Sequence, residues 1–202
     1  MRVDFTPIRE RTQKAIPFAA QYTLEDIRSA AIESVESMLN LIADLDDSDV
    51  TFVPVDPEAN DPYAAPEEQN IGWTLAHLIV HVTASTEEYV SVASVISRGI
   101  DYPREPRLRY ETHWKSLTTK LQCEQRLRES LRIRLGYLDA FPDVILDGRW
   151  ERGERFLELF GEVDAKAAYL FGLNHEAGHH AQMLEVRRQA LAARAEPEAA
   201  AG

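Results

Sequence analysis

Cysteine is almost absent from this sequence, with Cys123 alone among 202 residues. A single cysteine provides no disulfide framework and excludes a zinc cluster built from several thiolates. No apolar run approaches the roughly 20 residues that a membrane-spanning helix needs. The first ten residues, MRVDFTPIRE, lack the apolar core of a signal peptide. We therefore expect a cytoplasmic protein.

Positive charge is also scarce. The chain has 22 Lys and Arg residues against 34 Asp and Glu residues, which gives a formal net charge of −12. Nucleic acids and anionic membrane surfaces are bound through clusters of basic side chains, and the sequence contains no basic run. We expect neither a nucleic acid nor a membrane as partner, and a small molecule as substrate.

Convincing strand patterns are missing as well. The best candidate, VTFVPV at residues 50–55, contains a proline, which is disfavoured inside a sheet. Four long segments instead carry apolar residues at helical spacing, and an apolar fraction of 45% is enough for a full core. The pattern predicts an all-α, up-and-down four-helix bundle, with helices at about 23–45, 71–97, 110–140 and 164–193.

Local signals support these boundaries. Thr23 can cap the first helix together with Asp26, and Asp164 can cap the last. The segment 46–70 is rich in Pro, Asp and Glu and predicts a long loop between the first two helices, of a length that is often functional. FLELFG, at 156–161, can form a short helical turn. We divide the chain into an N-terminal extension (1–21), the bundle (22–194) and a disordered tail (195–202).

Histidine spacing carries the strongest functional signal. Four of the six histidines form two pairs at i, i+4, His77 with His81 and His175 with His179. Such pairs lie on one helix face with Cβ atoms about 5–6 Å apart, so that both imidazoles can reach one metal ion. Ordinary core histidines bonded to carbonyl groups are the alternative. Two such pairs in one predicted bundle favour metal binding.

Two other metal chemistries fit less well. His175, Glu176 and His179 spell the His-Glu-x-x-His signature of zinc proteases. Those enzymes take a third ligand downstream and align their peptide substrate on a sheet edge. Here the only later histidine is the adjacent His180, and no strand is visible. A carboxylate-bridged di-iron site needs a second Glu-x-x-His unit, which is absent.

The segments WTLAHLIVHVTASTEEY (73–89) and HEAGHHAQM (175–183) resemble the DinB/YfiT-like family of four-helix metalloproteins. That family begins its second helix with an aromatic residue and a hydroxyl, which are Trp73 and Thr74 here. The resemblance extends from about Tyr22 to Ala193. It departs from the family pattern at the residues before the second ligand histidine and before the glutamine, which are not ligand positions.

The resemblance implies a mononuclear metal site on His81, His175 and His179. His81 lies eight residues after the tryptophan of the motif. In the last helix, the family motif places a glutamine three residues after the second histidine, which matches Gln182. Zinc, nickel, iron or manganese could occupy such nitrogens.

Three imidazoles with a fourth position open are typical of catalytic rather than structural zinc. An open position can bind water and lower its pKa, or bind a thiol as thiolate. The resemblance implies the second for some family members, transferases that use a low-molecular-weight thiol such as bacillithiol or mycothiol. We predict a metal-dependent transferase or hydrolase. The alternative is a non-catalytic stress-response or sensory module whose site is closed, for example by His77 as a fourth ligand.

Further side chains are candidates for the site. Glu176 could act as a base or hold a ligand imidazole by its free N–H, or be an ordinary ion-paired glutamate. Gln182 shares the face of the two ligand histidines and could orient substrate or water. Glu88 shares the face of His81 but could equally form an interhelical ion pair. We expect neither His113 nor His180 to be a ligand, and no nucleophilic role for Cys123. Three arginines could hold an anionic substrate: Arg149, Arg152 and Arg155.

The last helix is apolar on two sides, which predicts contacts with more than one neighbour. The segment 141–160 could cover part of this surface. Alternatively, a second copy of the chain could cover this surface, and we predict such a homodimer packed along the helix. The residues opposite the histidine face are Leu170, Leu173, Ala177, Leu184 and Leu191.

Overall fold

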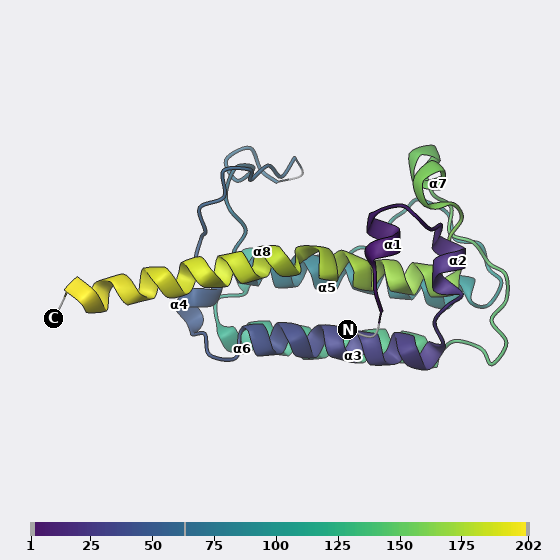
Figure 1. Cartoon of the computed structure of the whole chain (residues 1–202), viewed down its shortest axis with the longest axis horizontal. Coiled ribbons are helices and arrows are strands. Elements are labelled where there is room, and N and C mark those ends of the chain that lie inside the picture. The colour runs from purple at the N-terminus through teal and green to yellow at the C-terminus, as the bar shows by residue number, and fades with distance from the viewer. Residues whose placement is uncertain (1–2, 63, 201–202) are drawn as a thin grey trace.

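The computed structural model describes residues 3–62 and 64–200, of which residues 196–200 are described by their backbone alone. These residues form helices and no strand, which confirms the all-α prediction. The long helices are α3 (Leu24–Leu41), α5 (Leu75–Ile96), α6 (Lys120–Asp139) and α8 (Ala165–Ala200) (Figure 1). The short ones are α1 (Thr6–Arg9), α2 (Ala15–Ala19), α4 (Asp47–Val50), the 3-10 turn η1 (Trp114–Ser116) and α7 (Glu154–Phe160).

Capping residues determine where the long helices begin. Thr23 and Asp26 exchange hydrogen bonds at the start of α3, and Asp164 accepts from the backbone of α8, both as predicted. The prediction that the third helix starts at Tyr110 is wrong. Residues 110–119 form a loop with the η1 turn, because the reciprocal bonds between Thr119 and Gln122 begin α6 at Lys120.

Two helix ends differ from the sequence-based boundaries. The first helix stops at Leu41, and the following residues turn into α4 inside the long connection to α5. Helix α8 continues to Ala200, through most of the segment predicted as a tail, while residues 201–202 lie outside the described residues.

Helices α3 and α6 are antiparallel neighbours. The backbone N–H of Lys120 at the start of α6 donates to Asp47, just beyond the end of α3. At the other end of the bundle Arg28 of α3 pairs with Asp139 of α6.

Helix α8 runs parallel to α3 and antiparallel to α5. Ser34 donates to Glu176 and, further along both helices, Arg187 donates to the carbonyl of Leu41. Helix α5 runs in the opposite direction to α8. Trp73, just before the first residue of α5, contacts His179 in the middle of α8, whereas Thr86, in the middle of α5, contacts Gly172 nearer the start of α8.

The long helices therefore run up, down, down and up, without strict alternation. Helix α5 packs against both α8 and α6, and α3 packs against both α6 and α8. Because α5 and α6 are parallel neighbours, a tight turn cannot join them, and the segment 97–119 crosses back along the bundle.

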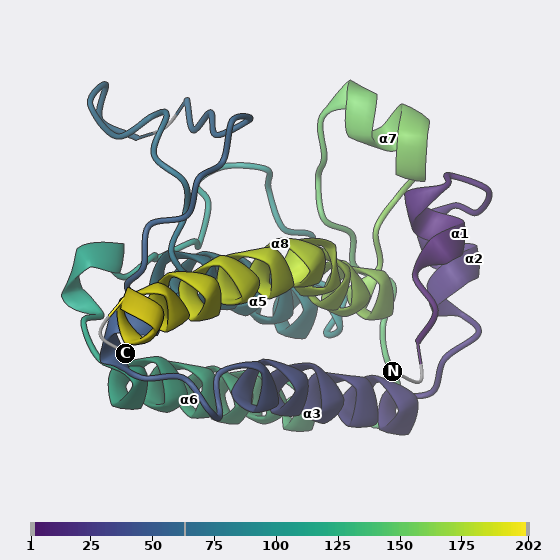
Figure 2. The same ribbon diagram turned by 60° about the vertical axis from the view of Figure 1, so that its left-hand side comes forward.

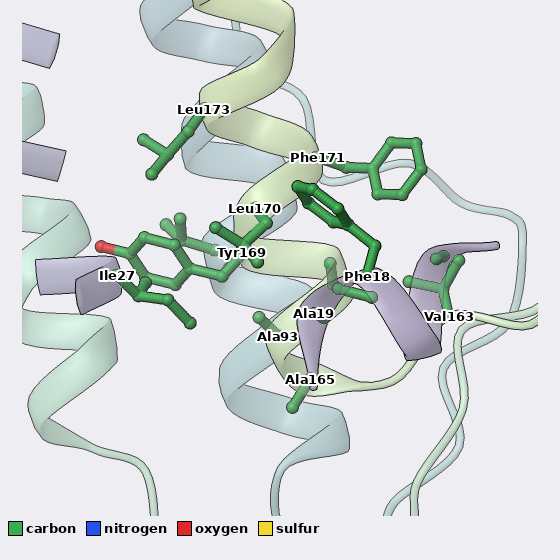
Figure 3. Close-up of a cluster of buried hydrophobic side chains, with 14 of the residues drawn as sticks. Phe18, Ala19, Ile27, Ala93, Val163, Ala165, Tyr169, Leu170, Phe171 and Leu173 are labelled. Carbon is green, nitrogen blue, oxygen red and sulfur yellow. The ribbon is translucent and has the colours of Figure 1, made fainter. Parts of the chain in front are cut away.

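The N-terminal extension packs against the C-terminal half of the chain. Figure 3 shows Phe18 of α2 beside α8, near Leu170 and Phe171. Phe156 and Phe160 of α7 also make ring contacts with Phe171 of α8. The apolar surface of α8 is thus largely covered within the chain.

The sequence predicts no membrane-spanning helix. None of the helices in the described part of the chain is long and apolar enough to cross a membrane.

Candidate metal centre

Close packing of α5 on α8 places three histidines together. His81 lies on α5, and His175 and His179 lie one turn apart on α8. Each offers a ligand atom within 4.8 Å of the others, and among the described residues these three form the group that could hold a metal ion. Their ring centroids are 5.0, 5.0 and 4.8 Å apart. The structure therefore brings together the three ligand positions that the sequence predicts.

A glycine lets the two helices approach. Gly172 of α8 lies against α5, where a Cβ atom would come 3.1 Å from the Cβ of Tyr89 and 3.2 Å from Cγ2 of Thr86. The Thr86 hydroxyl also donates to the Gly172 carbonyl at 3.1 Å. A larger residue at this contact would separate the helix that carries His81 from the helix that carries the other two histidines.

Burial keeps His81 and His175 neutral. Desolvation, reinforced by the neighbouring imidazoles, lowers the pKa of His81 to about 2. Desolvation likewise lowers the pKa of His175 to about 4, with a further contribution from His179. A metal ion binds the unprotonated ring nitrogen, and at neutral pH neither ring carries the second proton that would prevent this.

One unsatisfied nitrogen supports the fit of a metal ion. Nδ1 of His175 is buried and has no hydrogen-bond partner. Buried polar atoms are nearly always paired, and an exception in a native fold needs an explanation. An unpaired imidazole nitrogen beside two further imidazoles suits a transition metal.

Gln182 lies where the sequence predicts it. Its Oε1 is 2.9 Å from Nδ1 of His179. An amide oxygen only accepts, so the His179 proton is on Nδ1 and the lone pair of Nε2 is free for a metal. Gln182 thereby fixes the orientation of the His179 ring, as polar partners of metal-binding histidines do.

Glu176 does not lie at the site. Its carboxylate oxygens accept hydrogen bonds from Arg134, at 2.7 and 2.9 Å, and from Ser34 at 2.7 Å. The Arg134 and Glu176 side chains are 0% and 1% exposed. Successive helical residues are rotated by about 100°, so Glu176 faces α6 and α3 while His175 faces α5. The predicted catalytic role of Glu176 is therefore not supported, and its ion pair instead fixes how α8 is rotated in the bundle.

His77 is held between two tryptophans and does not belong to the cluster of three histidines. Its ring stacks on Trp73 with centroids 4.4 Å apart and on Trp114 at 5.0 Å, the latter nearly parallel at 3°. Burial lowers the pKa of His77 to about 4. The two remaining histidines have other partners. His113 stacks on Trp114, and Nε2 of His180 lies 3.2 Å from the hydroxyl of Ser37.

Arg109 and Glu111 reach the site and were missed by the sequence reasoning. The Arg109 guanidinium lies 2.9 Å from Nδ1 of His81 and donates to Ser85 and to Glu111. Glu111 itself lies 3.7 Å from the same His81 nitrogen. The helix predicted from Tyr110 hid Glu111, and Arg109 directly precedes that predicted helix. The available signal was the capping box at Thr119, the only convincing helix start in that region.

The other candidates lie outside the cluster of three histidines. Glu88 is buried and paired with Arg107, so the ion-pair alternative holds. Burial raises the pKa of the Cys123 thiol to about 12, which leaves no thiolate for nucleophilic chemistry. Arg149 pairs with nearby carboxylates. Arg152 and Arg155 line a different pocket of about 810 Å³, away from the three histidines.

A pocket of about 850 Å³ opens over His81 and His175. Its walls come from the Trp73–His77–Trp114 stack, from Arg109 and Glu111, and from residues 60–62, 64, 65 and 68 of the loop before α5. A smaller pocket of about 200 Å³ lies at His179 and Gln182 and is closed by residues 56–60 of the same loop. Figure 2 shows this loop projecting from the bundle on the side of α5 and α8.

Comparison with known proteins agrees with this arrangement. A family model described as the DinB superfamily matches residues 32–183, which is well over half of the chain and includes all three histidines and Gln182. No curated protein and no solved structure matches the chain. The chain belongs to the DinB superfamily.

Proposed function

We propose that this member of the DinB superfamily binds a divalent transition metal through His81, His175 and His179 and catalyses a transferase or hydrolase reaction on a small molecule. The observation that carries the proposal is the convergence of three partly buried imidazoles, of which those of His81 and His175 line a pocket of about 850 Å³. Zinc, nickel, iron and manganese all accept such ligands.

The stacking of His77 supports an open coordination position. A fourth protein ligand would close the site and make it structural. Since His77 is stacked between Trp73 and Trp114, the side of the site towards the pocket is left for a small molecule. A metal ion bound there would act as a Lewis acid and lower the pKa of a thiol or water.

The residues of the chain would position the reactants. The Trp73–His77–Trp114 stack offers flat apolar surface of the kind that holds small substrates. Gln182 orients His179. In place of Glu176, we propose Glu111 as the acid or base of the reaction, because it lines the pocket and burial raises the pKa of its carboxyl group.

Metal content tests the site directly. Untagged protein should contain close to one equivalent of metal by elemental mass spectrometry, and His81→Ala and His175→Ala should each lose it. His180→Ala, which alters a histidine bonded to Ser37 outside the site, is the matched control and should keep the metal. Absence of metal from the wild-type protein after reconstitution would contradict the proposal.

Cobalt substitution separates the catalytic from the non-catalytic alternative. With an open position, addition of a small thiol should change the visible absorption of the Co²⁺ protein. An unchanged spectrum would favour a closed structural or sensory site. If the thiol binds, Glu111→Gln should lower the turnover of an electrophile, compared with wild type per bound metal ion.

A further inference from the structure

The partner of His81 in this structure is a cation. Nη2 of Arg109 lies 2.9 Å from Nδ1 of His81, and Nε of Arg109 donates to Ser85 Oγ at 3.1 Å. Arginine has donors only, so Nδ1 of His81 is the acceptor. A neutral imidazole carries one proton, which must then be on Nε2.

This arrangement is incompatible with metal binding by His81. If the metal takes Nδ1, it needs the lone pair that Arg109 occupies. If the metal takes Nε2, the proton of the neutral ring must be on Nδ1, where it would point at an N–H group of Arg109. In both cases the guanidinium has to leave His81. Repulsion between the guanidinium and a divalent cation acts in the same direction.

We propose that Arg109 is an internal cation that occupies His81 in the metal-free chain and is displaced when a metal ion binds. The inference rests on the proposed function in taking His81 as a ligand. Arg109 is then a positioning residue that sets metal affinity, and in the metal-free chain it gives Nδ1 of His81 a hydrogen-bond partner.

The neighbours of Arg109 make the exchange possible. The guanidinium already bonds Glu111 and Ser85, so it keeps partners after leaving His81. Its side chain is 23% exposed and lies at the pocket wall, which leaves room to move. Glu111 Oε2 is 3.7 Å from Nδ1 of His81 and could accept that proton when the metal takes Nε2.

Metal affinity of variants tests the exchange. We expect Arg109→Gln to bind Zn²⁺ about tenfold more tightly than wild type, measured against a chromophoric chelator, because the competing charged hydrogen bond is gone. Arg109→Lys keeps the charge but not the guanidinium fork, and should fall between the two. Lys115→Gln removes a nearby positive charge that pairs with Glu68 rather than His81, and should leave the affinity within about twofold of wild type.

Unchanged or weaker Zn²⁺ binding by Arg109→Gln would overturn the inference. A second measurement needs no variant. Long-range ¹H–¹⁵N correlation spectra of the metal-free wild-type protein should show the His81 proton on Nε2, and a proton on Nδ1 would also overturn it. If the wild type binds no metal, the proposed function fails. If it binds metal and Arg109→Gln binds no more tightly, the inference alone fails.

Discussion

His81 and His175 remain uncharged in the folded chain under conditions in which exposed histidines take up a proton. Burial lowers their pKa values to about 2 and about 4, whereas an unfolded chain has a histidine pKa near 6.5. Between these values the unfolded chain binds more protons than the folded one. Acid therefore favours unfolding as the pH falls below about 6.5, and stability stops depending on these groups above that value.

The metal-free protein should consequently lose stability between pH 7.5 and pH 5.5. Each of the two histidines should contribute about 1 kcal/mol of the loss, and His77 should add a similar amount because burial lowers its pKa to about 4. The loss is measured as the decrease in the free energy of unfolding in urea with a chelator present. His175→Asn should show a smaller loss than wild type over the same range. A free energy of unfolding that is independent of pH would contradict the burial of these side chains.

At the scale of single residues, the sequence indicates which side chains lie together where spacing decides, and not where a distant partner decides. The i, i+4 spacing and the family motif identified the three histidines and Gln182. The role of Glu176 depends on Arg134, which lies 42 positions away in the chain, and no local pattern reveals that partner. Arg109 likewise meets His81 only because the segment 97–119 crosses the bundle.

Helix packing provides a prediction at the scale of elements. Gly172→Leu should force α8 away from α5, because even a Cβ atom would come within 3.1–3.3 Å of Tyr89 and Thr86. We expect a loss of about 1–3 kcal/mol in stability, as overpacked contacts show, together with weaker metal binding. Urea unfolding and chelator competition measure the two effects.

Gly178 is the matched control on the same helix. A Cβ atom there meets nothing within 4 Å, and glycine inside a helix costs about 1 kcal/mol relative to alanine. Gly178→Ala should therefore stabilise the protein and leave its metal affinity unchanged. Equal effects of the two substitutions would show that Gly172 is not a packing contact.

The predictability of the helices followed from their capping residues. Thr23 with Asp26 and Asp164 at α8 were recognised, and both helix starts are where these signals place them. Apolar periodicity without a cap extended the third helix back to Tyr110, although the residues before Thr119 make ion pairs and ring contacts around the site instead. Periodicity indicates that a helix is present, and hydrogen bonds at its end determine its first residue.

The N-terminal extension yields a prediction for the whole molecule. Deletion of residues 1–21 should uncover Leu170 and Phe171 and remove several buried apolar side chains, among them Phe5, Ile8 and Phe18. Each such side chain contributes about 1.5–3 kcal/mol when buried. We expect a large decrease in the unfolding temperature and increased light scattering. An unchanged unfolding temperature would show that the bundle does not need the extension.

The homodimer remains a prediction, now with less exposed apolar surface to support it. Leu170 and Leu173 are fully buried within the chain, whereas Leu184 is 49% exposed. Sedimentation equilibrium should detect the dimer, and Leu184→Glu should weaken it if α8 forms the contact. A monomer at micromolar concentration would contradict the expectation.

The parallel pairing of α5 and α6 has a consequence for how this protein could change. A helix of 22 residues is about 33 Å long, and about ten extended residues could span that distance. The connection between α5 and α6 nevertheless comprises residues 97–119, so it is more than twice as long as the direct path along the helix requires. The connection carries three residues of the pocket wall, which are Arg109, Glu111 and Trp114. The connectivity of the bundle thus places a long connecting segment beside the histidines. Substitutions in this segment could adapt the pocket to new substrates while the helices keep their sequence and packing.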